Sequence, residues 1–149
     1  MRIRLVSEVN RPFDWVSGHF DKELFVFLLP PPFVARLIRY DGSDPGNLVH
    51  IRFLLPWRSD WISKIISSKR NTEAFEFVDI GEKLPFGLKT WKHQHIVKKL
   101  NEKQSQIIDD MSFSTCCKIF DLLIYPVLYL AFSPRKQLYK RYFEKTEAP

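Results

Sequence analysis

Two histidines stand two residues apart in a segment, 88–97, that alternates between two kinds of side chain. One set consists of Trp91, His93, His95 and Val97, whereas the other set is mostly polar. Because successive side chains of a β-strand point to opposite faces, we expect the first set to face the interior. An imidazole changes its charge near neutral pH, so this face could move a proton, orient a polar ligand or bind a metal ion.

The partner of these histidines depends on how the strand pairs with the next one. A hairpin with residues 102–103 at its tip places Asp110 opposite His95. An aspartate in that position can fix the imidazole tautomer and raise its pKa. We therefore take His95 and Asp110 as candidate catalytic residues; the alternative is a buried pair that only satisfies its own hydrogen bonds. A slip of one residue would turn Asp110 to the other face.

Neither a metal nor a cofactor is expected. Two histidines on one strand face could share a metal ion, but no third protein ligand is evident from the sequence, and zinc sites use three or four. The adjacent cysteines Cys116 and Cys117 do not complete such a site. Neighbouring cysteines rarely bond to each other, so a reducing, cytoplasmic location is the simple interpretation.

The elements that position the histidines are predicted from periodicity and from turn residues. Period-two segments indicate seven strands, and helical spacing indicates two short helices after the first strand and a long helix at the end. Ser133 and Pro134 can interrupt or restart that long helix. The predicted strands cover 2–9, 34–40, 48–57, 60–69, 73–80, 87–100 and 104–115, and the predicted helices 13–20, 21–29 and 118–145.

Short connections between the strands favour antiparallel pairing, since a parallel pair needs a long crossover. The fold class is therefore α+β: a curved antiparallel sheet of about seven strands wrapped around a long C-terminal helix. With 149 residues, we expect one domain over 1–149. Aromatic residues make up 15%, which is more than a small tight core needs, so we expect a cavity between sheet and helix.

Arg135 falls within the apolar stripe of the terminal helix, near Leu128 and Phe132. A buried arginine needs a partner, so we expect Asp79, Asp110 or the acidic head of a ligand beside it, or else a guanidinium that reaches water at the rim. The apolar run 119–132 is too short to span a membrane. It is either a membrane-contacting gate or a helix packed on both sides, and we favour the second.

The formal net charge of +6 allows an anionic partner, such as a membrane surface or nucleic acid. The basic residues are scattered and no nucleic-acid motif is present, so a solvated charged face is the simpler interpretation. The first eight residues break their apolar run too soon for a signal peptide.

The chain contains five short motifs: Phe77-x-Asp79, Pro85-Phe86, Trp91-x-His93-x-His95, Asp110-x-x-Phe113 and Phe132-x-x-Arg135. Together they resemble the pattern of the START-like, birch-pollen-allergen-like superfamily, also called SRPBCC or polyketide cyclase/dehydrase-like. The chain departs from the pattern at Leu84, where the family has glycine, and at Ser114, where it has tyrosine. The resemblance implies a helix-grip fold with an internal cavity for an apolar ligand, but no catalytic motif.

We therefore expect a protein that binds a hydrophobic small molecule, such as a lipid, polyketide or isoprenoid-like compound, without catalysis. One alternative is a cyclase- or dehydratase-like enzyme that uses the histidine–aspartate pair as acid and base. Another is a basic module for an anionic membrane or nucleic acid. The expected ligand-binding residues are Phe77, Trp91, His93, His95, Asp110, Leu128, Phe132 and Arg135.

Overall fold

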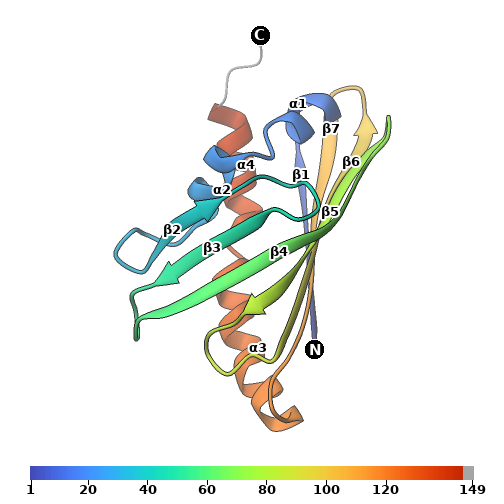
Figure 1. The fold of residues 1–149 in the computed structure, drawn as a ribbon. Helices are drawn as coiled ribbons and strands as arrows, with labels where there is room; N and C mark the ends of the chain where they lie inside the picture. The colour runs from blue at the N-terminus through green and yellow to red at the C-terminus, as the bar shows by residue number, and fades with distance from the viewer. Residues whose placement is uncertain (146–149) are drawn as a thin grey trace.

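The computed structural model, which describes residues 1–145, consists of one curved antiparallel sheet and four helices (Figure 1). The predicted fold class is confirmed. The strands are β1 (Arg2–Val9), β2 (Ala35–Tyr40), β3 (Leu48–Phe53), β4 (Ser59–Arg70), β5 (Ala74–Lys83), β6 (Thr90–Asn101) and β7 (Gln104–Ser114). Their order in the sheet is β1-β7-β6-β5-β4-β3-β2, so the first strand pairs with the last and every other neighbour is consecutive.

Two short helices, α1 (Phe13–Gly18) and α2 (Lys22–Leu28), follow β1. The side chain of Asp21 accepts a hydrogen bond from the backbone amide of Leu24 at 3.0 Å, which caps the start of α2. Three prolines at 30–32 follow α2, and they cannot continue a helical hydrogen-bond ladder. The predicted pair of short helices is therefore confirmed, and α2 packs against the C-terminal part of the chain.

The terminal helix is divided into α3 (Lys118–Phe132) and α4 (Arg135–Lys145). The break lies at Ser133 and Pro134, where it was predicted, because proline has no amide hydrogen to donate to the preceding turn. Figure 1 shows the two helices following each other across one side of the sheet.

The hairpin of β6 and β7 contains the one register error of the sequence interpretation. Asn101 pairs with Gln104 as predicted, but the pairing shifts between Lys99 and Asn101. This bulge inserts one extra residue into β6, so His95 pairs with Asp109 instead of Asp110. The single-residue shift turns Asp109 toward the interior and Asp110 toward the outside.

The core consists of two apolar clusters with charged residues between them. The polar positions His95 and His93 lie between Val97 and Trp91 along β6, and Asp109 lies between Ile107 and Met111 along β7. The cluster near α1, α2 and α4 contains Val9, Phe13, Val16, Leu24, Leu28, Val97, Ile107, Tyr139 and Phe143. The cluster near α3 contains Ile3, Leu5, Trp61, Leu88, Trp91, Met111, Phe113 and Leu128.

The sequence predicted that helix α3 is packed on both sides, and the structure shows that it is packed on one side only. Leu128 is its one buried residue, whereas Ile119 is 71% and Leu130 is 70% exposed. The sheet covers only the side that carries Leu128, and no other described segment covers the opposite side. Within residues 1–145, no helix is both long enough and apolar enough to cross a bilayer.

Candidate functional site

A cavity of about 290 Å³ lies between the sheet and helices α2, α3 and α4. Its walls are mostly aliphatic and aromatic, which is typical of sites for small organic ligands. Seven of the eight residues expected to bind ligand line this cavity, and Asp110 does not. The seven are Phe77, Trp91, His93, His95, Leu128, Phe132 and Arg135.

Aromatic rings hold the two imidazoles in place on the cavity wall. The ring of Phe77 stacks on His95, with centroids 4.4 Å apart and planes 17° apart. The rings of Trp91 and Phe132 approach His93 edge-on at 5.8 and 5.9 Å. These contacts restrict the imidazole orientations, so each ring nitrogen has a defined direction.

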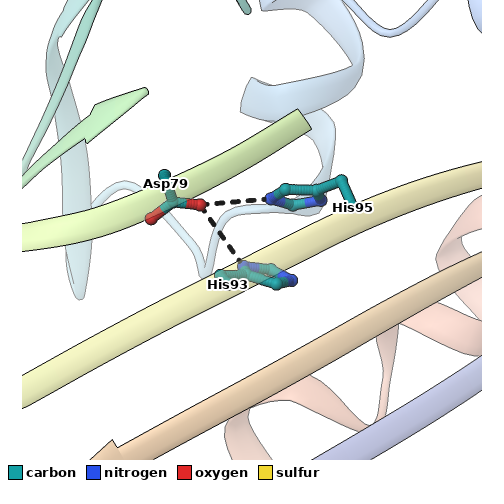
Figure 2. Close-up of side chains that lie close together, drawn as sticks. All are labelled: Asp79, His93 and His95. Carbon is teal, nitrogen blue, oxygen red and sulfur yellow. Dashed lines mark ion pairs between the residues drawn. The ribbon is translucent and has the colours of Figure 1, made fainter. Parts of the chain in front are cut away.

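One carboxylate, Asp79, lies beside both imidazoles on the same wall (Figure 2). Asp79 is opposite His93 in the pairing of β5 with β6. Its Oδ2 atom is 3.8 Å from Nδ1 of His93 and 3.5 Å from Nε2 of His95. All three residues are buried and line the cavity. Asp79 was expected only as a partner of Arg135, although the motif Phe77-x-Asp79 already placed it on the same strand face as a predicted ligand-binding residue.

A second carboxylate, Asp109, lies behind the imidazoles and does not line the cavity. Its Oδ1 atom accepts a hydrogen bond from Nε2 of His93 at 2.9 Å and one from the Tyr139 hydroxyl at 3.4 Å. The same atom lies 3.1 Å from Nδ1 of His95, but the geometry there is not that of a hydrogen bond. Asp109 is 1% exposed, so its charge is compensated by these neighbours rather than by water.

Arg135 is buried and points toward Asp109, with Nη1 3.8 Å from Oδ1. The guanidinium also lies over the ring of Phe132 at 4.6 Å. The expectation of a carboxylate partner is therefore confirmed, but the partner is neither of the two that were named. The Arg135 side chain is 10% exposed.

The predicted pair of His95 and Asp110 is wrong. Asp110 lies on the outer face, where it accepts a hydrogen bond from Nε of Arg2 at 2.7 Å. The bulge in β6 is the reason the assumed pairing failed. Alternation along β7 itself was a usable signal, because Asp109 shares a face with Met111 and Phe113, whereas Asp110 shares one with Ser112 and Ser114. The aspartate that lies opposite His95 is Asp109, with Oδ1 3.1 Å from Nδ1 of His95.

Burial and charge together determine the protonation of the cluster. Burial and the neighbouring His95 lower the pKa of His93 to about 4. Burial alone would lower the pKa of His95 as well, but its contacts with Asp109 and Asp79 outweigh burial and raise it. Despite the opposing effect of burial, the two histidines hold the pKa of Asp79 below its ordinary value and that of Asp109 far below it. The guanidinium of Arg135, 3.8 Å from Asp109 Oδ1, also helps to lower the pKa of Asp109.

In protein dialysed against a chelator, the pKa values of the two histidines should be shifted in opposite directions from the ordinary value. NMR of the imidazole carbon-bound protons is expected to show His93 neutral until the pH falls to about 4. His95 should keep its proton above the ordinary histidine pKa of about 6.5. Two overlapping titrations at that ordinary value would contradict both pKa shifts.

No family model and no curated protein matches the chain, whereas its fold matches solved structures over nearly the whole length. The aromatase/cyclase Zhui from Streptomyces sp. R1128 superposes with a TM-score of 0.73 at 12% identity, covering 97% of this chain and 94% of the other. A norcoclaurine synthase from Thalictrum flavum gives 0.71 at 13%, with the same coverage. Ara h 8.0201 gives 0.60 at 10%, covering 98% and 99%. The chain therefore has the helix-grip fold of START-like and birch-pollen-allergen-like proteins.

Proposed function

We propose that the chain binds a hydrophobic small molecule in the cavity between the sheet and helices α2, α3 and α4, without catalysing a reaction on it. The observation that carries the proposal is the cavity of about 290 Å³ with mostly apolar walls and one buried polar wall. An apolar ligand leaving water gains about 25 cal/mol per Å² of buried surface, before the entropy cost of binding.

The two kinds of wall specify the class of ligand. The aliphatic and aromatic side chains fit a lipid, polyketide or isoprenoid-like body, and the imidazoles of His93 and His95 with the Arg135 guanidinium fit an oxygen-bearing end. Among the structural neighbours, a norcoclaurine synthase was solved with dopamine and hydroxybenzaldehyde, which are small aromatic molecules. That similarity supports a small-molecule ligand.

The proposal is tested by native mass spectrometry of purified protein and by titration with the uncharged fluorescent probe N-phenyl-1-naphthylamine. We expect one probe molecule per chain, with a dissociation constant in the micromolar range, equivalent to about −8 kcal/mol. A ligand that copurifies should be displaced by the probe. Protein that carries no ligand and takes up no probe would refute the proposal.

We propose as a second function that α3 contacts an anionic membrane transiently. The observation is an uncovered apolar stripe on α3, formed by Ile119, Leu123, Val127 and Leu130, each at least 59% exposed. These positions share one side of a helix with 3.6 residues per turn. The same helix contributes Val127, Leu128 and Phe132 to the cavity wall, so a lipid-bound α3 would place the cavity beside the source of an apolar ligand. The positive net charge of +6 favours an anionic surface.

Cosedimentation with vesicles of phosphatidylcholine and phosphatidylserine tests this contact. The double variant Ile119→Glu/Leu130→Glu should lose binding, because it places two carboxylates on the apolar stripe. Phe33→Glu is the matched control, since Phe33 is 67% exposed and lies outside α3. Equal sedimentation of the double variant and the control, or no binding by the unaltered chain, would refute the contact.

A further inference from the structure

Two ring nitrogens and one carboxylate oxygen converge on the polar wall of the cavity. One ligand atom each from Asp79, His93 and His95 can be chosen so that all lie within 4.8 Å of one another. Asp79 Oδ2 lies 3.8 Å from Nδ1 of His93 and 3.5 Å from Nε2 of His95. Ligand atoms bonded to zinc at about 2.0–2.2 Å in a tetrahedron lie about 3.3–3.6 Å apart. Small side-chain adjustments would therefore close this group around an ion, and the third ligand that the sequence did not reveal is Asp79.

Asp109 supplies the outer contacts that such ligands need. Each imidazole has one nitrogen directed at Asp79 and the other directed at Asp109: for His93, Nε2 is 2.9 Å from Asp109 Oδ1, and for His95, Nδ1 is 3.1 Å from it. A proton held on the Asp109 side leaves the lone pair of each ring on the Asp79 side. A carboxylate behind a ligating histidine fixes the tautomer and the ring orientation in this way.

The nitrogen of His95 that faces Asp79 is Nε2, 3.5 Å from Oδ2. Asp79, His93 and His95 all line the cavity, whereas Asp109 lies behind them. An ion held by the three would thus keep one coordination position open toward the cavity, as a site that binds both a metal and a ligand requires.

We propose that Asp79, His93 and His95 bind one divalent transition-metal ion of the zinc class, with an open position facing the cavity. Imidazole and carboxylate ligands suit zinc and its neighbours in the series. With both imidazoles neutral, the ion, Arg135 and the two carboxylates carry one net positive charge. An anionic oxygen of the cavity ligand, such as a carboxylate or an enolate, would balance that charge.

The test uses untagged protein that has been treated with a chelator and then titrated with zinc by calorimetry. We expect saturable binding of one zinc ion per chain, and Asp79→Asn should weaken the affinity about 100-fold because the variant keeps the shape but loses the anionic ligand. Asp109→Asn should weaken it about 10- to 100-fold. His50→Gln is the control: His50 also contacts an aspartate, Asp60, at 2.9 Å, but both lie outside the cavity. Affinity that is equal in Asp79→Asn and unaltered protein would overturn the proposal.

A second measurement uses only the unaltered protein, so it does not depend on whether a variant folds. Cobalt added to the unaltered protein should give visible d–d absorption. In a separate titration, zinc should shift the NMR signals of the His93 and His95 imidazole rings and leave those of His19 and His50 in place. Shifts confined to His19 or His50, or no saturable change in any histidine, would overturn the site. Because zinc alone is the probe, the result is independent of whether the cavity binds an apolar molecule.

Discussion

Asp109→Asn is expected to lower the free energy of unfolding by about 3–5 kcal/mol, because breaking a buried charge network by removing one partner leaves the other charges uncompensated. Asp109 is 1% exposed and its Oδ1 atom faces His93, His95, Tyr139 and Arg135. Asparagine keeps the shape of the side chain but removes its charge. Denaturant unfolding followed by circular dichroism measures the loss.

The adjacent residue provides the control for this prediction. Asp110→Asn makes the same chemical change one position along the strand, where the side chain pairs with the exposed Arg2 on the outer face. Exposed ion pairs contribute little, so the loss of stability should be much smaller. Similar losses in the two variants, or a larger loss in Asp110→Asn, would contradict the register of β6 and β7.

Val49→Trp is expected to weaken the binding of N-phenyl-1-naphthylamine at least about 10-fold, or 1.4 kcal/mol. Val49 lies on β3, is 8% exposed and lines the cavity. An indole at this position would occupy space that the probe needs. Fluorescence titration gives the affinity, and near-ultraviolet circular dichroism checks the packing, since overfilling a core costs about 1–3 kcal/mol of stability.

Val6→Trp is the matched control for the cavity variant. Val6 is 39% exposed and does not line the cavity, so the same substitution there should leave the probe affinity unchanged. A folded Val49→Trp protein with full affinity would place the probe outside the cavity.

The architecture could be predicted from the sequence because its signals are local. Alternation of side chains indicated the inward face of β6, with Trp91, His93 and His95, and the structure confirms it. The pair Ser133-Pro134 marked the end of α3 in the same way. Each of these features depends on the backbone chemistry of a few neighbouring residues.

The composition of the polar cluster could not be predicted in full, because it depends on pairing between strands. The bulge beside Leu100 depends on how β6 fits its neighbours, and it decides which residue of β7 lies opposite His95. Asp79 lies beside the histidines through the pairing of β5 with β6, which alternation alone does not specify. The exposure of α3 was missed for a related reason: an apolar sequence does not reveal whether the fold supplies a surface to cover it.

Intermolecular nuclear Overhauser effects between bound N-phenyl-1-naphthylamine and the protein test the central claim, that the apolar ligand lies between the sheet and the helices. We expect contacts from the probe to Phe77 and Leu128, which line the cavity. Contacts confined to Ile119 and Leu130, on the exposed side of α3, would contradict the claim and show that the probe binds only to the surface of the helix.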